Sequence, residues 1–162
     1  MRSLDISNGE GTGVALFVQG CPFRCHNCFN AETWDFNSGK EWALEAENQF
    51  IELASKPYIS RVSILGGEPL ADENLEDVLK LVNKIRLLLP DKTIWLYTGY
   101  LWRDLMKNDL RKAIVSQCDI VVDGQYIESL RDTTLEWRGS SNQRVIDVQE
   151  TLKSNSLILK DK

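Results

Sequence analysis

Three of the four cysteines of this chain lie in one short segment, CPFRCHNC. The spacing Cys21-x3-Cys25-x2-Cys28 puts three thiolates on one loop. Structural zinc sites usually take their ligands as two separated pairs, and the ring of His26 would have to fold back to complete a closed zinc site. Thiolates also hold iron–sulfur clusters, in which each of four irons needs a ligand. The segment therefore favours a [4Fe-4S] cluster with one iron left open for a substrate.

The fourth cysteine, Cys118, is not expected to complete this site. Cys118 precedes a predicted strand, whereas the other three cysteines follow one, so they belong to opposite ends of a parallel sheet. A strand of about six residues separates those ends by roughly 20 Å, whereas a metal–sulfur bond is about 2.3 Å long. We expect Cys118 to be a small buried residue of the core.

The elements that must position the cysteine loop alternate between strands and helices. Short apolar, β-branched runs predict strands, and apolar residues at helical spacing predict helices. The expected strands are 13–19, 61–65, 93–97 and 119–123, with an edge strand at 144–148, and the expected helices are 41–55, 72–89 and 101–115. Such alternation predicts an α/β fold with mostly parallel strands. Because a complete eightfold barrel needs about 250 residues, we expect an incomplete TIM-type β/α barrel or an open sheet.

The composition predicts one globular domain in residues 1–150, with residues 151–162 as a C-terminal tail and the place where disorder is expected. The net charge of −5 and the scattered basic residues argue against a nucleic-acid partner. No run approaches the roughly 20 apolar residues that span a membrane, and the N-terminus lacks an apolar leader. We therefore expect a cytoplasmic protein without a membrane partner, whose cysteines stay reduced.

The carboxyl ends of parallel strands meet at one edge of a sheet, where such folds place their sites. Each predicted parallel strand leads into a loop of unusual composition. In chain order these loops read GCPFRCHNC, GGEP, TGY and DGQY. Their common position makes one site at this edge the expected arrangement.

The cysteine loop after the first strand and the Gly-Gly-Glu after the second resemble the radical S-adenosylmethionine (SAM) superfamily. The match goes further, because the chain also resembles the branch that activates anaerobic ribonucleoside-triphosphate reductase. The segments that carry it are, in order, NGEGTG, CPFRCHNCFN, TWDFNSG, LGGEPL, IWLYTGY, VDGQY and WRGSSNQ. The likeness extends from Asp5 to Arg144, which is nearly the whole chain.

This resemblance implies a partial barrel of the radical SAM type, in which Cys21, Cys25 and Cys28 hold a [4Fe-4S] cluster and SAM chelates the fourth iron. A low-potential reductant such as flavodoxin would supply one electron, which cleaves SAM to methionine and a 5'-deoxyadenosyl radical. That radical would abstract hydrogen from a glycine of the large reductase subunit and leave a glycyl radical. No catalytic side chain beyond the cluster ligands is implied.

The SAM-binding residues expected first follow the second strand. Gly66 and Gly67 allow close approach of the backbone to the amino acid end of SAM, and Glu68 places an anion near its ammonium group. A tight strand-to-helix turn closed by Pro69 is the alternative use of these glycines.

Further contacts are implied around the rest of SAM. Asn27, Cys28 and Phe29 correspond to the segment that packs on the adenine. Thr98, Gly99 and Asp123 lie at the ends of strands, where the ribose or carboxylate would lie. Some relatives have a lysine where this chain has Gln125, so the cation that meets the carboxylate is unassigned. Arg138, within WRGSSNQ, would either meet a carboxylate or pair with a surface acid.

Two alternatives remain open from the sequence. An activase of a different glycyl radical enzyme often carries ferredoxin inserts and a longer barrel, and this chain shows neither. A non-catalytic iron–sulfur carrier or zinc module would be expected to show a fourth cysteine at cluster spacing and has no need of GGEP.

Overall fold

Six strands form one sheet, and their order in space follows their order in the sequence. The computed structural model describes residues 1–23, 28, 34–35 and 41–160. The four inner strands run parallel, and each edge strand runs antiparallel to its neighbour. The strands are β1 (Arg2–Asp5), β2 (Gly13–Val18), β3 (Arg61–Gly66), β4 (Thr93–Tyr97), β5 (Ile120–Asp123) and β6 (Arg144–Asp147).

The predicted α/β class, the four parallel strands and the edge strand at 144–148 are confirmed. The sequence did not predict β1, because its residues RSLD form no apolar run and three of the four are exposed. The described sheet is a mixed, mostly parallel one, and its interpretation as part of a TIM-type barrel stays a prediction.

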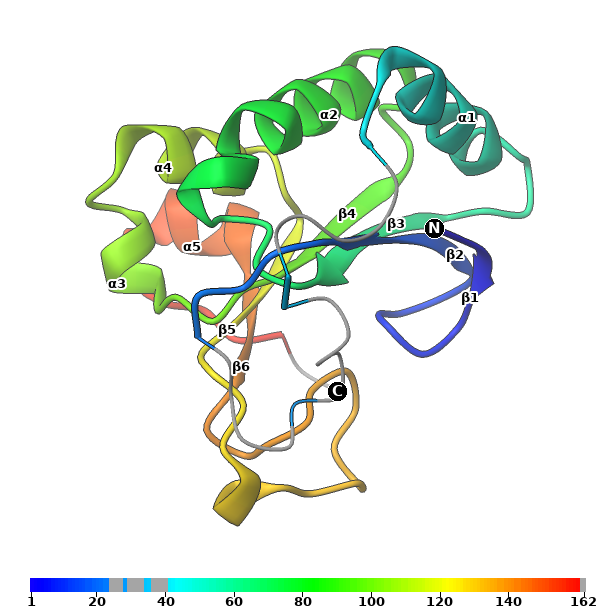
Figure 1. Ribbon diagram of the computed structural model, residues 1–162. Coiled ribbons are helices and arrows are strands. Elements are labelled where there is room, and N and C mark those ends of the chain that lie inside the picture. Colours follow the sequence, from blue (N-terminus) through cyan, green and yellow to red (C-terminus); the bar gives the residue numbers. More distant parts are fainter. Residues whose placement is uncertain (24–27, 29–33, 36–40, 161–162) are drawn as a thin grey trace.

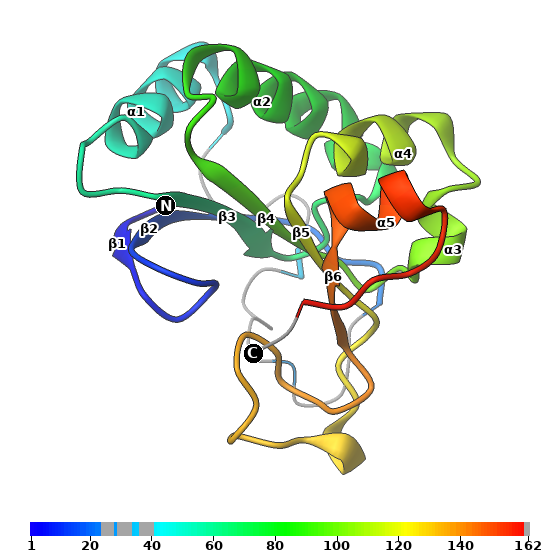
Figure 2. The same ribbon diagram turned by 180° about the vertical axis from the view of Figure 1, so that it is seen from behind.

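The helices cover one face of the sheet (Figures 1 and 2). Parallel neighbours that follow one another in sequence need right-handed crossovers, which place all connecting helices on the same side. The helices are α1 (Leu44–Ala54), α2 (Leu75–Leu88), α3 (Trp102–Leu105), α4 (Asp109–Ser116) and α5 (Val148–Ser154), with 3-10 turns η2 (Asp72–Asn74) and η3 (Glu128–Leu130). Loops 6–12 and 124–143 lie on the other side of the sheet.

Alternation along the strands separates two clusters of buried side chains. On β4, Ile94 and Leu96 pack into the main core beneath the helices, whereas Trp95 belongs to a second cluster on the opposite face. Tyr97 and Trp137 pack against that second cluster. The face without helices is therefore lined by aromatic residues and walled by loops.

The prediction of one continuous helix at 101–115 is wrong in one respect, because the segment is interrupted between α3 and α4. The side chain of Asn108 accepts a hydrogen bond from the backbone N–H of Arg111 at 3.0 Å, so Asn108 caps a new helix instead of continuing the old one. The helix predicted at 72–89 is present as η2 followed by α2, and the one predicted at 41–55 is present as α1.

The described residues after β6, up to Lys160, are attached to the sheet. The side chain of Asp147 caps α5, and Asn155 ends that helix in the left-handed conformation with φ 57°. The chain then returns along β6, where the backbone N–H of Lys160 donates to the carbonyl oxygen of Val145 at 2.8 Å. In the part of the chain that the structure describes, no helix is long and apolar enough to cross a membrane.

Candidate functional site

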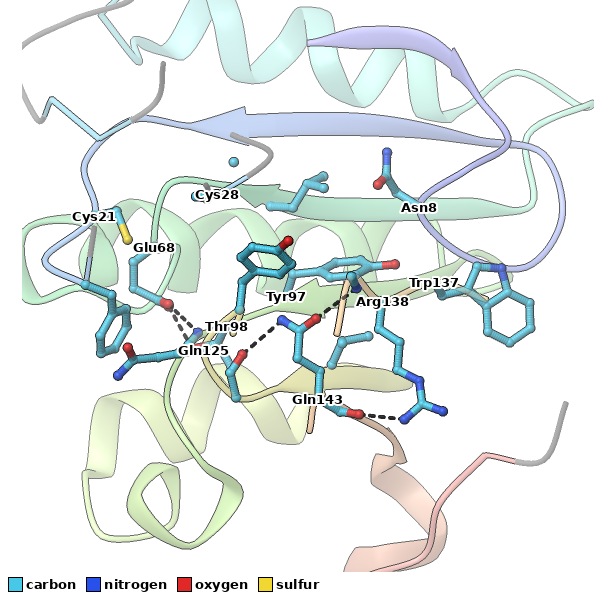
Figure 3. A pocket seen from close by; sticks show the side chains of 18 of the residues that line it. Asn8, Cys21, Cys28, Glu68, Tyr97, Thr98, Gln125, Trp137, Arg138 and Gln143 are labelled. Atoms are coloured by element: carbon cyan, nitrogen blue, oxygen red, sulfur yellow. Dashed lines mark hydrogen bonds between the residues drawn. The ribbon is translucent and has the colours of Figure 1, made fainter. Parts of the chain in front are cut away.

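The loops after the parallel strands line one cavity of about 340 Å³ (Figure 3). Residues from the loops after β2, β3, β4 and β5 all contribute, so the expected gathering of these loops is found among the described residues. Figure 3 shows Cys21, Glu68, Thr98 and Gln125 toward one end, and Asn8, Trp137 and Arg138 toward the other. The cavity therefore has a cysteine end and a distal end.

Two of the three predicted cluster ligands can be placed. Cys21 and Cys28 are both partly exposed and both line the cavity. Cys25 lies outside the described residues, as do His26, Asn27 and Phe29. Two thiols on one cavity wall fit the soft, thiolate-rich donor set of an iron–sulfur cluster. Among the described residues no group of three or more potential metal ligands occurs.

The Gly66–Gly67 turn follows β3 and packs directly on β2. Gly66 has φ +105°, and a Cβ added there would lie 2.7 Å from the backbone nitrogen and oxygen of Val18. The N–H of Gly67 donates to the carbonyl oxygen of Val18 at 2.7 Å, and that of Glu68 donates to Gly20 at 2.7 Å. At Gly66, glycine is therefore required by both the backbone angle and the close packing. The turn also fixes Gly20, the residue before Cys21.

Glu68 is almost fully buried, and its carboxylate accepts three hydrogen bonds from two segments of the chain. Oε2 accepts hydrogen bonds from the hydroxyl of Thr98 at 2.7 Å and the backbone N–H of Leu70 at 2.9 Å. Oε1 accepts from the N–H of Gly99 at 2.6 Å. Burial raises the pKa of Glu68 to about 7, although these hydrogen bonds and the charge of Arg111 act to lower it. Glu68 thus joins the ends of β3 and β4 beside the cavity.

Thr98 and Gly99 lie where the sequence placed them, at the end of β4 and in the cavity lining. Besides donating to Glu68, the Thr98 hydroxyl accepts a hydrogen bond from the N–H of Tyr100 at 3.1 Å. Their contact with SAM stays a prediction, but both residues already help to shape the wall of the cavity.

Asp123 differs from the other predicted site residues, because it is not among those that line the cavity. Its carboxylate is fully buried and pairs with Arg144 on β6 through Nε at 3.0 Å and Nη2 at 2.6 Å. It also accepts the N–H of Trp102 at 2.9 Å. These bonds give Asp123 a structural use, and its predicted contact with SAM has the least support of the set.

Arg138 and Trp137 line the distal end of the cavity. Nη1 of Arg138 donates to the carbonyl oxygen of Gln143 at 2.6 Å, so part of its guanidinium braces the WRGSSNQ loop. Trp137 adopts φ 64° and packs edge-on against Trp95 with ring centroids 5.0 Å apart. Arg138 lies toward the end of the cavity away from Cys21 in Figure 3, and its predicted contact with a carboxylate stays a prediction.

Gln143 organises this loop in a way that the sequence did not reveal. Its Oε1 accepts the N–H groups of Gly139 at 2.9 Å and Ser140 at 3.1 Å, while Nε2 donates to the carbonyl oxygen of Gly124 at 3.0 Å. One side chain thus joins the WRGSSNQ loop to the end of β5, and both the loop and Gln143 line the cavity.

Sequence reasoning also missed the N-terminal wall, where Ser7 and Asn8 line the cavity. This loop wraps around Arg61, which is fully buried and ion-paired with Asp5 at 3.0 Å. The guanidinium donates to four carbonyl oxygens of the loop, those of Asp5, Asn8, Glu10 and Gly11. Although burial alone would raise the pKa of Asp5, hydrogen bonds from Asn8, Arg2 and Arg61 hold it below its ordinary value. The glycines of NGEGTG were the available signal, because Gly9 leaves no room for a Cβ beside Arg61.

Cys118 lies in the main core and is fully buried, as predicted. Its thiol donates a weak hydrogen bond to the carbonyl oxygen of Ile114 at 3.5 Å, and burial raises its pKa to about 12. Cys118 is not among the residues that line the cavity. It therefore acts as a small apolar core residue.

Comparison with known proteins identifies the class of this site. Residues 7–146 match the family model described as a 4Fe-4S single cluster domain. This match covers most of the chain and includes every residue from Ser7 to Gln143 that lines the cavity. The protein therefore has the domain of a single-cluster iron–sulfur protein.

Several curated relatives narrow the class further. The chain is 42% identical over 144 residues to the anaerobic ribonucleoside-triphosphate reductase-activating protein of Escherichia coli K12, covering 88% of this chain and 92% of that protein. The proteins of the same name from Vibrio cholerae serotype O1 and Enterobacteria phage T4 are 41% identical (86% and 90% covered) and 36% identical (87% and 87% covered). The chain belongs to the family of anaerobic ribonucleoside-triphosphate reductase-activating proteins.

Proposed function

We propose that this protein activates an anaerobic (class III) ribonucleoside-triphosphate reductase by reductive cleavage of SAM at a [4Fe-4S] cluster held by Cys21, Cys25 and Cys28. The observation that carries the proposal is that Cys21 and Cys28 line the same cavity as Gly66, Gly67 and Glu68. The names of the relatives support the reductase as the partner. The 4Fe-4S family model supports the cluster.

The bound cluster would supply the electron that cleaves SAM, and the resulting 5'-deoxyadenosyl radical would take a hydrogen atom from a glycine of the reductase. The protein would bind the cluster and SAM, orient SAM and exclude water from the site. A thiolate loop that offers three cysteines leaves one iron for the amino and carboxylate groups of SAM. A low-potential reductant such as flavodoxin would provide the electron, and the reaction would take place in the cytoplasm.

The residues after β3 and β4 would hold the amino acid end of SAM beside the cysteines. The Gly66–Gly67 backbone lies on the cavity wall without side chains in the way. The charge of Glu68 is partly suppressed by burial, so its main contribution is to hold the Thr98–Gly99 segment in place through hydrogen bonds. An ammonium group nearby would favour the ionised form of Glu68.

The proposal is tested by assembling the cluster without oxygen, adding dithionite and SAM, and measuring 5'-deoxyadenosine. Addition of the reductase should then produce a glycyl radical signal in electron paramagnetic resonance. Cys21→Ala, Cys25→Ala and Cys28→Ala should each abolish both products, because each removes one ligand of the cluster. Cys118→Ala is the matched control and should keep both, since Cys118 lies in the core and not on the cavity.

An intact cluster that never cleaves SAM would overturn the enzymatic proposal and favour an iron–sulfur carrier. Cleavage of SAM with a radical on a different glycyl radical enzyme, and none on the reductase, would favour the other activase.

A further inference from the structure

Three side chains form a row from the cysteine loop to the helical layer. The rings of Phe23 and Tyr100 meet edge to face, with centroids 4.9 Å apart and an interplanar angle of 71°. The guanidinium carbon of Arg111 on α4 lies 4.1 Å from the centroid of the Tyr100 ring, and its Nη2 lies 3.0 Å from the Tyr100 hydroxyl. Phe23 stands midway in sequence between Cys21 and Cys25, so this row leads from α4 into the cluster-binding segment.

The Phe23 ring also rests on the backbone of Gly99. A Cβ added at Gly99 would lie 2.6 Å from two ring carbons of Phe23, which is closer than side chains can pack. Glycine is thus the residue that leaves room for the ring at this position. Phe23 is therefore held between the Gly99 backbone and the Tyr100 ring.

Arg111 is itself fixed at the other end of the row. Its Nε donates to the carbonyl oxygen of Leu70 at 2.8 Å, and Nη2 pairs with Asp72 at 3.1 Å. The Arg111 side chain is only 15% exposed, whereas that of Asp72 is 81% exposed, so the partly buried bond to Leu70 fixes Arg111 more than the surface ion pair does. A cation over an aromatic face is stabilising when it is shielded from water.

The backbone around Cys21 is tied down on the other side. The carbonyl oxygen of Gly20 accepts the N–H of Glu68 at 2.7 Å, and the N–H of Cys21 donates to Trp34 at 3.1 Å. These bonds fix the backbone at the start of the cysteine loop. Phe23 is the described residue of that segment that packs against both Tyr100 and Gly99.

We propose that Tyr100 and Arg111 are positioning residues, which act through Phe23 to hold the Cys21–Phe23 segment in place before the cluster is assembled. The inference rests on the proposed function in taking Cys21 as a ligand. Ordering a loop costs conformational entropy, and contacts that order it beforehand remove that cost from the binding step. Arg111 is not among the residues that line the cavity.

The first test measures how fast iodoacetamide alkylates Cys21 in the full-length apoprotein, by mass spectrometry. Phe23→Leu and Tyr100→Leu should each raise the rate about fivefold, because each variant loses the stabilisation of one aromatic pair. Tyr100→Phe keeps the ring and should stay within about twofold. Tyr58→Leu is the control, because Tyr58 is an exposed aromatic remote from this row. Cys118 should remain unlabelled in every variant, which shows that the fold is intact.

Arg111 is tested by charge and by shape. Arg111→Met removes the cation and should raise the alkylation rate of Cys21 as Tyr100→Leu does. Arg111→Lys keeps a cation over the ring, so its rate should lie between those of wild type and Arg111→Met. Arg103→Met, on the exposed side of α3, is the matched control. In the reconstituted protein, the same variants should change the electron paramagnetic resonance line shape of the reduced cluster with SAM.

Wild-type alkylation rates and spectra in Phe23→Leu, Tyr100→Leu and Arg111→Met would overturn the positioning role. Because alkylation is measured without cluster or SAM, it stays informative if the wild-type protein fails to cleave SAM. That failure would count against the proposed function alone.

Discussion

The hydroxyl of Thr98 donates a hydrogen bond of 2.7 Å to the carboxylate of Glu68, and this bond joins the ends of two neighbouring strands beneath the cavity. Both side chains are buried, so the bond is shielded from water. A buried acceptor that loses its donors costs more free energy than the net gain of an ordinary hydrogen bond. The Glu68–Thr98 pair therefore determines how firmly the loops after β3 and β4 are held together.

Glu68→Gln should reduce the free energy of unfolding by about 1–3 kcal/mol at neutral pH. The amide group would turn a donor toward the N–H of Gly99 or the hydroxyl of Thr98, where the carboxylate now accepts. Urea unfolding followed by circular dichroism measures the change. Glu73→Gln, on the exposed η2 turn, is the control and should change stability little. Equal stability of both variants would contradict the structural role of Glu68.

The same site should make stability depend on pH. Because burial raises the pKa of Glu68 from 4.5 to about 7, the folded protein holds this proton more tightly than the unfolded chain. The extra stability that the protonated Glu68 carboxyl gives the folded protein is fully present below pH 4.5. It is lost as the pH rises from there through about 7. The difference in unfolding free energy between wild type and Glu68→Gln should fall over this range by at most about 3 kcal/mol. A difference that is flat or rises with pH would show that the pKa of Glu68 is not raised.

Gly66→Ala should destabilise the protein more than Gly124→Ala. Both glycines have positive φ, +105° and +100°, so alanine strains the backbone at either position by about 1–3 kcal/mol. At Gly66 the new Cβ also meets the backbone of Val18 at 2.7 Å, whereas at Gly124 its nearest neighbours are 3.7 Å away. The excess loss of unfolding free energy in Gly66→Ala measures the packing of the turn on β2. Similar losses in the two variants would mean that this packing can relax.

Asp123→Asn should reduce the free energy of unfolding by more than it reduces the binding free energy of SAM. The variant leaves the Arg144 guanidinium without its buried carboxylate, and because Arg144 is 36% exposed we expect a cost of about 2–3 kcal/mol. Unfolding in urea gives the stability, and calorimetric titration of the reconstituted protein gives the SAM affinity. Thr98→Ala, which alters the cavity lining, provides the comparison. A large loss of SAM affinity with little loss of stability would restore Asp123 as a ligand contact.

The sequence was most informative where one physical rule governed a whole segment. The inner strands β2 to β5 were predicted to within a residue or two because buried parallel strands are continuous apolar runs. β1 could not be predicted in this way, since its outward residues are exposed and its position depends on pairing with β2. The break before α4 depends on Asn108, whose capping role competes with helix continuation only in the folded chain.

The candidate site was predictable at the level of loops and less so at the level of side chains. The common edge of parallel strands was enough to bring Cys21, Gly66 and Thr98 to one cavity. The same rule placed Asp123 in the predicted site. Only the antiparallel pairing of β5 with β6 shows that the carboxylate of Asp123 is bound to Arg144 instead. The sequence placed Arg61 at the start of an apolar strand. Its neighbours in the sequence give no sign that the loop after β1 wraps around its side chain.

The wrapped Arg61 has a consequence for how the cavity wall can move. The buried guanidinium is stabilised by the carboxylate of Asp5 and by the loop carbonyls that surround it. Peeling the N-terminal loop away would break the Asp5 ion pair and the four backbone hydrogen bonds of Arg61 together, so the loop should not fray as independent surface segments do. Its amide protons should exchange with solvent only in the same rare opening events that disrupt β3 itself.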